Sequence, residues 1–394
     1  MENYIYFNPT KIIFGKGTHS LAGEQVLAFG GKKVLLHYGG GSIKRTGIYD
    51  TVVASLDTAG VPFVELPGVV PNPRISLVRE GIELVKRQGI DFILAIGGGS
   101  VIDSAKAIAF GSLLAPGKDI WDDYFMDPTA TIPAAMPLGV VLTIPAAGSE
   151  SSNSCVITNE DTGFKRGVKT ELYLPKFSIL DPEVSYSLPP FQTACGAIDI
   201  HAHMFERYFS AVEHTDVTDQ LLEGAMRSVI DLAPRILKDP RNYGYRAEMM
   251  YAGTIAHNNS LNPGRGGGDW GSHQIEHELS GRYDMTHGAG LAIVIPAWMK
   301  YVSRKHPEKF VQYAVRVWGV TLPPSDTFGV IDAMIERQEQ WYRSLGIKTT
   351  LSDLGYDDTY FQDMAEKALV NKGSIGSYCR LGAQDIVEIL KLAL

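Results

Sequence analysis

The sequence has little of several features that mark particular classes of protein. It holds three cysteines in 394 residues, Cys155, Cys195 and Cys379, with neither paired nor metal-ligand spacing. Three cysteines cannot all pair within one chain, which favours a reducing compartment. The opening residues also lack the basic and apolar regions of a secretory signal peptide. We therefore expect a cytoplasmic protein.

Long apolar runs and an excess of positive charge are missing too. The longest apolar runs, such as Gly139–Ile144 and Leu291–Met299, are far shorter than a bilayer-spanning helix. The formal charge of −8 disfavours binding to nucleic acid or anionic membranes through net charge. The basic pairs Lys32-Lys33 and Lys44-Arg45 are short enough to be ordinary solvated surface. Neither nucleic acid nor a membrane is expected as a partner.

The first part of the chain alternates between strand and helix patterns. Its length exceeds what one hydrophobic core usually supports, so two domains are expected. Apolar, branched runs bounded by turn residues predict strands, and apolar spacing of 3.6 predicts helices between them. The predicted strands are Val34–Tyr38, Phe63–Leu66, Phe92–Ile96 and Gly139–Ile144, and the helices Tyr49–Ala59 and Ile75–Gln88. This alternation predicts an α/β domain over residues 1–185 with a parallel, Rossmann-like sheet.

After Asp181-Pro182 the strand patterns nearly vanish and long helical patterns follow. The predicted helices are Gln192–Phe209, Asp219–Leu237, Tyr245–Ser260, Trp270–Tyr283 and Gly288–Lys300. Residues 186–394 are therefore expected to form an all-helical domain.

Two glycine loops each follow a predicted strand. Gly39-Gly40-Gly41-Ser42 follows Val34–Tyr38, and Gly97-Gly98-Gly99-Ser100 joins Phe92–Ile96 to a helical pattern over Val101–Phe110. A glycine turn before a helix N-terminus can bind a pyrophosphate, and we expect Ser100 to cap that helix with Asp103 completing a capping box. Neither loop matches G-x-G-x-x-G, and either alone could be a structural turn. Two loops at carboxyl ends of parallel strands favour a bound dinucleotide.

The residues after the first strand bear on the choice of cofactor. An acidic residue there would bind the ribose of NAD and repel a 2′-phosphate. This chain has glycine and serine instead, with Lys44 and Arg45 close behind. The composition favours NADP over NAD, although a shifted loop could bring Asp57 or another acid into play.

The second half of the chain concentrates histidine. Asp199 and His203 lie four apart on one predicted helix, His273 and His277 repeat that spacing, and His287 precedes Gly288. One carboxylate and three imidazoles can hold Fe²⁺ or Zn²⁺ with a position open for substrate. Any one of these histidines alone would more often be a packed or surface residue. His201, on another face of its helix, is interpreted as structural.

The segment Thr143–Glu150 has two interpretations. It could be a strand-to-helix turn capped by Ser149, or the hydroxyl of Thr143 and the exposed backbone could line the space between cofactor and metal. The residues favour neither.

Taken in order, these motifs resemble the iron-containing (group III) alcohol dehydrogenase family, close to its NADPH-dependent aldehyde reductases and butanol dehydrogenases. The resemblance runs along the whole chain, and its most specific part is Asp199 with His203, then His273, His277 and His287, with fourteen residues from His273 to His287. The other matching segments are Phe7–Gly17, Tyr38–Ser42, Pro71–Pro73, Gly97–Asp103, Thr143–Glu150, Leu188–Pro190 and Asp269–Ser272.

The resemblance implies roles for particular residues. Asp199, His203, His273 and His287 would be the metal ligands, with His277 near the nicotinamide as the candidate proton relay. Cofactor contacts would be made by Gly39, Gly40, Gly41, Ser42, Asn72, Gly98, Gly99, Ser100, Asp103, Thr143, Ser149 and Lys165. It also implies a dehydroquinate synthase-like fold with the active site between two domains, and a homodimer. Ala147 departs from the family, since many relatives have threonine or serine there.

The expected function is metal-dependent hydride transfer between NAD(P)(H) and a small primary alcohol or aldehyde such as butanol or butanal. The main alternative is a metal-dependent lyase or hydrolase on the same fold. A lyase for a phosphorylated acid should need a cluster of cations beside the metal, and only Arg265 and Arg282 lie near the ligand helix in sequence. A catalytically inactive metal- or nucleotide-binding protein is a further alternative, disfavoured by the complete ligand set.

Overall fold

The computed structural model describes residues 1–321 and 326–394, which form two compact units. The sheet unit comprises Phe7–Leu188 and Arg241–Asn258, and the helical unit comprises Met1–Tyr6, Pro189–Pro240 and Asn259–Leu394. A single boundary near residue 185 does not predict that Met1–Tyr6 belongs to the helical unit or that Arg241–Asn258 belongs to the sheet unit. The second of these segments carries α8 (Tyr243–His257), whose Met250 joins the apolar core of the sheet unit and whose Thr254 donates a hydrogen bond to Glu150.

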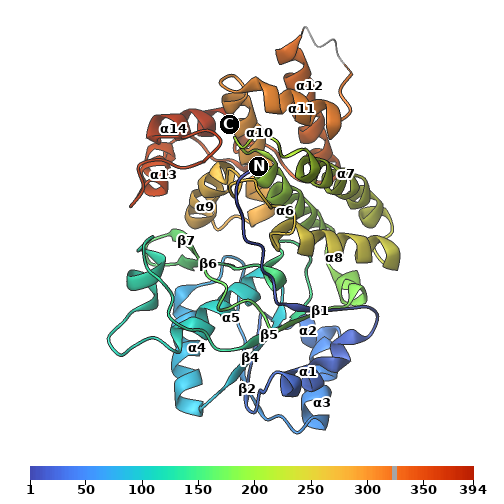
Figure 1. The fold of residues 1–394 in the computed structure, drawn as a ribbon, viewed down its shortest axis with the longest axis vertical. Coiled ribbons are helices and arrows are strands. Elements are labelled where there is room, and N and C mark those ends of the chain that lie inside the picture. Colours follow the sequence, from blue (N-terminus) through green and yellow to red (C-terminus); the bar gives the residue numbers. More distant parts are fainter. Residues whose placement is uncertain (322–325) are drawn as a thin grey trace. The chain divides into compact units, whose positions relative to one another are not determined.

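The sheet unit is built on a six-stranded sheet in the order β1-β8-β5-β4-β2-β3, with every neighbouring pair parallel (Figure 1). The strands are β1 (Lys11–Phe14), β2 (Val34–Tyr38), β3 (Phe63–Leu66), β4 (Phe92–Gly97), β5 (Leu138–Leu142) and β8 (Phe177–Leu180). This confirms the predicted α/β domain. The sequence patterns did not predict the short strands β1 and β8, or the antiparallel hairpin of β6 (Ser154–Asn159) and β7 (Phe164–Lys169).

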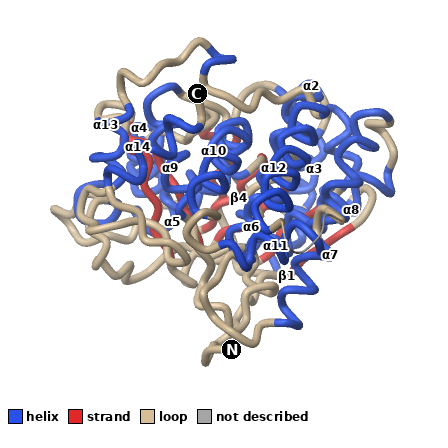
Figure 2. The backbone as a smooth tube through the Cα atoms, turned by 90° about the horizontal axis from the view of Figure 1, so that it is seen from above, coloured by secondary structure: helices blue, strands red, loops and turns tan. Residues whose placement is uncertain are grey.

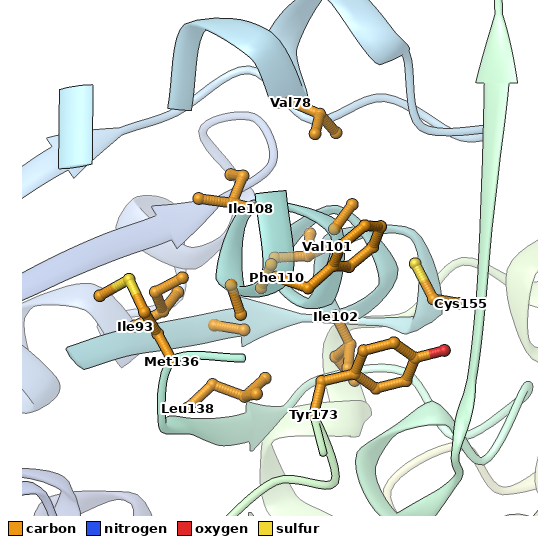
Figure 3. Packing of buried hydrophobic residues seen from close by; sticks show 14 of the residues in the cluster. Val78, Ile93, Val101, Ile102, Ile108, Phe110, Met136, Leu138, Cys155 and Tyr173 are labelled. Atoms are coloured by element: carbon orange, nitrogen blue, oxygen red, sulfur yellow. The ribbon is translucent and has the colours of Figure 1, made fainter. Parts of the chain in front are cut away.

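Helices cover both faces of this sheet because alternate strand residues point to opposite sides. Val34 and Leu36 share one apolar cluster with α1 (Ala22–Ala28) and α3 (Ile48–Thr58). The other face packs against α4 (Ile75–Gln88) and α5 (Gly99–Gly111), where Figure 3 shows Ile102, Ile108 and Phe110 of α5 among the buried side chains. The direction of the connections therefore changes between β2 and β4. Open α/β sheets bind ligands at the carboxyl ends of the strands that flank such a change.

The helical unit contains no strand within its described residues, apart from an isolated bridge between Ile375 and Leu381. Figure 2 shows α6, α9, α10 and α12 as helical tubes in this part of the chain. The helices are α6 (Pro190–Tyr208), α7 (Asp216–Lys238), α9 (Gly271–Tyr283), α10 (His287–Val302), α11 (Pro307–Arg316), α12 (Thr327–Ser344), α13 (Phe361–Ala368) and α14 (Ala383–Leu392). The expected all-helical region is confirmed. None of the described helices is long and apolar enough to cross a membrane.

Short elements complete the description. They are α2 (Ser42–Arg45), a π-helical turn at Trp121–Phe125 and 3₁₀ turns at Thr18–Leu21, Ser149–Ser151, Pro182–Ser187 and Ser352–Leu354.

Candidate metal centre and dinucleotide loops

Helix α6 places Asp199 and His203 one turn apart on a single buried face. Oδ1 of Asp199 lies 3.5 Å from Nδ1 of His203. His273, in the first turn of α9, brings its ring centroid to 5.0 Å from that of His203. Ligand atoms of these three residues all lie within 4.8 Å of one another, and all three residues are buried. The geometry matches what a single divalent ion needs from its protein ligands.

His287 joins this group as the first residue of α10. Its Nε2 lies 3.7 Å from Oδ1 of Asp199. The glycines that follow make this approach possible, because a Cβ on Gly288 would lie 2.2 Å from the backbone oxygen of Cys195. A Cβ on Gly290 would lie 2.7 Å from a carboxylate oxygen of Glu276. Only glycine lets the start of α10 pack this closely against α6 and α9, which positions His287 beside Asp199.

Two fully buried glutamates, which the sequence analysis did not identify, orient the histidines. Oε1 of Glu206 on α6 lies 2.8 Å from Nδ1 of His273 and accepts hydrogen bonds from the backbone N–H of His273 and the hydroxyl of Ser272. Glu276 on α9 pairs with Nδ1 of His287. Carboxylates in this position fix the tautomer of a ligand histidine and leave Nε2 for the metal. The signal in the sequence is a repeated His-x-x-Glu, at His203–Glu206 and His273–Glu276.

The electrostatics and the donor atoms fit a cation. Burial alone would raise the pKa of Glu206, but hydrogen bonds from His273 and Ser272 lower it below its usual range, so the carboxylate stays ionised. Nε2 of His273 is buried and has no hydrogen-bond partner within residues 1–321 and 326–394. A buried nitrogen without a partner is costly unless something binds it. Imidazole and carboxylate donors suit Fe²⁺ and Zn²⁺.

The other two histidines have different surroundings. His277 is half-buried, with its ring centroid 5.8 Å from that of His287. His201 is fully buried on another face of α6, where its Nε2 lies 3.1 Å from the hydroxyl of Tyr313 and its ring packs against Trp341. Burial lowers the pKa of His201 to about 3, so its ring is neutral. Its surroundings are those of a packed structural residue.

Three aromatic residues of the helical unit, Trp270, Tyr283 and Trp298, differ in their surroundings. Trp298 is fully buried and packs against Phe205 and Phe310, so it belongs to the core. Tyr283 stacks on Tyr356. Of these three, Trp270 is the one beside the candidate metal ligands, with its ring centroid 5.0 Å from that of His273.

In the sheet unit, the two glycine loops follow β2 and β4, the strands at which the connections change direction. Helix α5 begins at Gly99 with Gly98 as its N-cap, and no side chain caps it. The predicted cap by Ser100 is wrong because the helix begins earlier, which places Ser100 inside the first turn. Asp103 does not complete a capping box either, since its carboxylate accepts hydrogen bonds from Ser149 Oγ and from the backbone N–H of Val156.

The segment from Thr143 lies directly against the second glycine loop. The N–H of Thr143 donates to the carbonyl of Gly97 at 3.0 Å. A Cβ on Gly98 would lie 3.0 Å from Cβ of Ile144, and one on Gly99 would lie 2.9 Å from Cβ of Ala147. The glycines therefore let the two segments touch, and β5 ends at Leu142 rather than at Ile144 as predicted.

Lys106 on α5 supports this segment from beneath. Nζ of its fully buried ammonium group lies 2.7–2.9 Å from four oxygens, the carbonyls of Ser149, Ser152 and Ser154 and the hydroxyl of Ser149, which its three N–H groups share. One of the two interpretations of this segment has Ser149 capping a helix, but Gly148 is the N-cap of the short 3₁₀ turn. The hydroxyl of Ser149 instead bridges Lys106 and Asp103.

The remaining predicted cofactor residues lie in the same unit. Asn72 is buried in the turn after β3 with a left-handed φ of 54°. Lys165 is buried on β7, paired with Thr158 of β6, and its charge acts on Asp103.

Comparison with known proteins agrees with both halves of this description. Residues 9–182 match the family model of iron-containing alcohol dehydrogenase, and residues 193–394 match the C-terminal model of the Fe-containing alcohol dehydrogenase family. The chain is 42% identical to the probable NADH-dependent butanol dehydrogenase 1 of Bacillus subtilis, with 100% of each chain covered. It is 36% identical to the NADPH-dependent aldehyde reductase YqhD of Escherichia coli over 93% of each.

A solved structure extends the likeness to three dimensions. The NADH-dependent butanol dehydrogenase A of Thermotoga maritima superimposes with a TM-score of 0.94 at 42% identity, covering 100% of this chain and 99% of that one. These matches favour an oxidoreductase over the lyase alternative. The chain therefore belongs to the iron-containing alcohol dehydrogenase family.

Proposed function

We propose that this chain interconverts a small primary alcohol and its aldehyde, of the size of butanol and butanal, with a divalent metal and a nicotinamide dinucleotide. The observation that carries the proposal is the buried group of Asp199, His203 and His273, with the partly buried His287 beside Asp199 in the same unit. The relatives named as butanol dehydrogenases and aldehyde reductases support the substrate class.

Asp199, His203, His273 and His287 would hold the metal, with Fe²⁺ favoured and Zn²⁺ the alternative. When bound, the ion supplies Lewis acidity toward the oxygen of the alcohol or aldehyde. The protein's contribution is orientation: Glu206 and Glu276 each engage the Nδ1 of one ligand histidine. His277 would carry a proton between substrate and solvent, since imidazole titrates near neutral pH and this ring is half-buried.

The dinucleotide would bind the sheet unit. Its proposed contacts are Gly39, Gly40, Gly41, Ser42, Asn72, Gly98, Gly99, Ser100, Asp103, Thr143, Ser149 and Lys165. When bound, the nicotinamide supplies the site that gives or accepts the hydride. The N-terminus of α5, with no acidic residue in its first turn, suits a pyrophosphate. We favour NADP(H) over NAD(H) because the loop after β2 contains no acid to bind the ribose.

The lyase alternative requires cations for an acidic substrate, and the two candidates have structural roles. The guanidinium of Arg265 is fully buried and donates to the carbonyls of Arg207 and Tyr208 and to Asp219. The guanidinium of Arg282 lies 3.4 Å from the ring centroid of Tyr360. Both cations stabilise the helical unit, which favours a neutral substrate.

We also propose a cytoplasmic homodimer. The three cysteines, all buried and free, fit a reducing compartment. Strand β1 is the edge of the sheet, with Ile12 and Phe14 exposed, and a second copy could cover it. Light scattering should give twice the monomer mass, and a monomer at micromolar concentration would contradict the homodimer.

The test of the main proposal is anaerobic turnover of butanal with NADPH and with NADH. The protein is stripped with a chelator and reloaded with Fe²⁺ or Zn²⁺. Metal-restored oxidation of the nicotinamide is expected, with a higher kcat/KM for NADPH. If no short aldehyde is reduced although metal and cofactor are bound, the proposed reaction is wrong.

A further inference from the structure

A cluster of four side chains lies where β2 and β3 end, beside the first glycine loop. Glu65 of β3 accepts hydrogen bonds from the hydroxyls of Tyr38 and Tyr49 and from the ammonium of Lys44, the last at 3.4 Å. The ammonium of Lys44 also lies over both rings, 4.4 Å from the centroid of Tyr49 and 5.3 Å from that of Tyr38. Lys44 is therefore held by one carboxylate and two aromatic faces.

Because they bind each other, neither Lys44 nor Glu65 is well placed to select the cofactor. Burial would raise the pKa of Glu65, but hydrogen bonds from Tyr38 and Tyr49 and the charge of Lys44 lower it below its usual range. The carboxylate is thus ionised and balances the charge of Lys44. Because its two oxygens already accept these hydrogen bonds, Glu65 is poorly placed to bind a ribose hydroxyl as well. Asp57, the acid considered from the sequence, lies in the last turn of α3, while the glycine loop precedes the first turn.

Arg45, the next residue of α2, has different surroundings. Its side chain is exposed, and Nη1 lies 3.3 Å from the position that a Cβ on Gly41 would occupy. Its guanidinium takes part in no hydrogen bond or ion pair with the described residues. The guanidinium therefore rests against the glycine loop with its donors directed at no protein acceptor.

We propose that Arg45 binds the 2′-phosphate of NADP(H), and that Glu65 limits the preference for NADP(H) by holding Lys44. This inference rests on the proposed dinucleotide site. A guanidinium can donate two parallel hydrogen bonds to a phosphate, whereas the charge of Lys44 is already balanced. One available cation, with a second restrained beside it, makes the preference modest, so both dinucleotides bind.

The first test measures binding without turnover. Calorimetry on the metal-free full-length protein compares ADP-ribose with 2′-phospho-ADP-ribose. For Arg45→Gln, the Kd of 2′-phospho-ADP-ribose should rise about tenfold, since a charge-assisted hydrogen bond contributes on the order of 1.4 kcal/mol or more. The Kd of ADP-ribose should not change. Lys32→Gln is the matched control, because it removes an exposed cation just before β2, at the opposite end of that strand.

A double-mutant cycle tests the role of Glu65. Glu65→Gln keeps an acceptor for the tyrosines but removes the charge, and it should tighten 2′-phospho-ADP-ribose about threefold, the scale of an exposed ion pair. Lys44→Gln alone should change this Kd less than twofold, and in combination with Glu65→Gln it should abolish the gain. If Glu65→Gln does not fold, Tyr49→Phe replaces it in the cycle. This change removes one hydrogen bond to the carboxylate, which leaves Glu65 freer to pair with Lys44, so the Kd of 2′-phospho-ADP-ribose should rise slightly instead of falling.

The outcomes separate this inference from the proposed function. If neither ligand binds the wild-type protein, the proposed dinucleotide site is wrong, and this inference with it. If both bind and Arg45→Gln leaves their ratio unchanged, the site stands and the role of Arg45 is refuted. If Glu65→Gln gives a gain that persists without Lys44, the role of Glu65 as a restraint on Lys44 is refuted.

Discussion

Replacing Glu206 by glutamine should weaken metal binding although Glu206 is not itself a proposed ligand. The carboxylate is fully buried, and its Oε1 receives the Nδ1 of His273 at 2.8 Å. Its Oε2 accepts the backbone N–H of Trp270 at 2.6 Å. A glutamine has one oxygen and one NH₂ group. Its NH₂ group must therefore point at one of these two N–H donors, and that donor loses its acceptor. Either the orientation of the ligand histidine or the start of α9 loses its support.

The expected size follows from these contacts. Loss of the partner that orients a ligand histidine typically weakens metal affinity by about 10–100-fold. The unpaired buried donor should also lower the free energy of unfolding by about 1–3 kcal/mol. Both effects should occur without any change in the four proposed ligands.

The assay is competition for Zn²⁺ against a chelator of known affinity, together with urea unfolding of the metal-free protein. Glu223→Gln is the matched control: Glu223 is also buried, accepts a hydrogen bond from Tyr208 of α6, and lies in the same unit away from the ligands. The control should lose stability and keep its metal affinity. Equal Zn²⁺ affinities for wild type and Glu206→Gln would refute the orienting role of Glu206.

Three further predictions follow from the same description. His277→Ala should retain wild-type metal content by elemental analysis but lose most of its turnover of butanal; loss of metal would instead make His277 a ligand. Lys106→Met should lower the free energy of unfolding by about 3 kcal/mol or more, because buried carbonyls lose their donor, and should weaken ADP-ribose binding by calorimetry. The folded pKa of His201, about 3, is lowered from 6.5, so its contribution to stability is complete above pH 6.5 and is lost as pH falls toward 3. Between pH 7.5 and pH 5, wild type should therefore lose about 2 kcal/mol that His201→Phe does not lose, as measured by urea unfolding; equal losses would contradict a neutral His201.

Local sequence patterns predicted the elements whose apolar residues follow a regular period and end at turn residues. The bounds of β2, β3 and α4 agree with the prediction because their apolar periodicity ends at turn residues. Strand β5 ends two residues early for a reason that lies outside it. Thr143 and Ile144 have strand-forming side chains, but Ile144 packs against Gly98 of the neighbouring loop. No local pattern contains that contact.

In the candidate metal site, too, local spacing predicted some residues and tertiary contacts determined others. The four-residue spacing of Asp199 and His203 predicts that they share one face of a helix, and the structure places Oδ1 of Asp199 3.5 Å from Nδ1 of His203. Glu206 and Glu276 follow histidines on their own helices, yet each orients a histidine on a different helix. A glutamate is usually exposed, so its burial depends on tertiary contacts that a single sequence does not display.

Tertiary contacts distinguish the two adjacent cations that follow the first glycine loop. Lys44 and Arg45 carry the same charge and are neighbours in sequence, so the sequence analysis counted both in favour of NADP. Successive residues of a helix point about 100° apart, so the two side chains meet different neighbours. Lys44 meets Glu65, which lies 21 residues later on the adjacent strand, while Arg45 meets the loop itself. If Arg45 binds the 2′-phosphate as proposed, a preference for NADP(H) depends on one cation rather than two, and a change at Glu65 would alter it without any change in the loop.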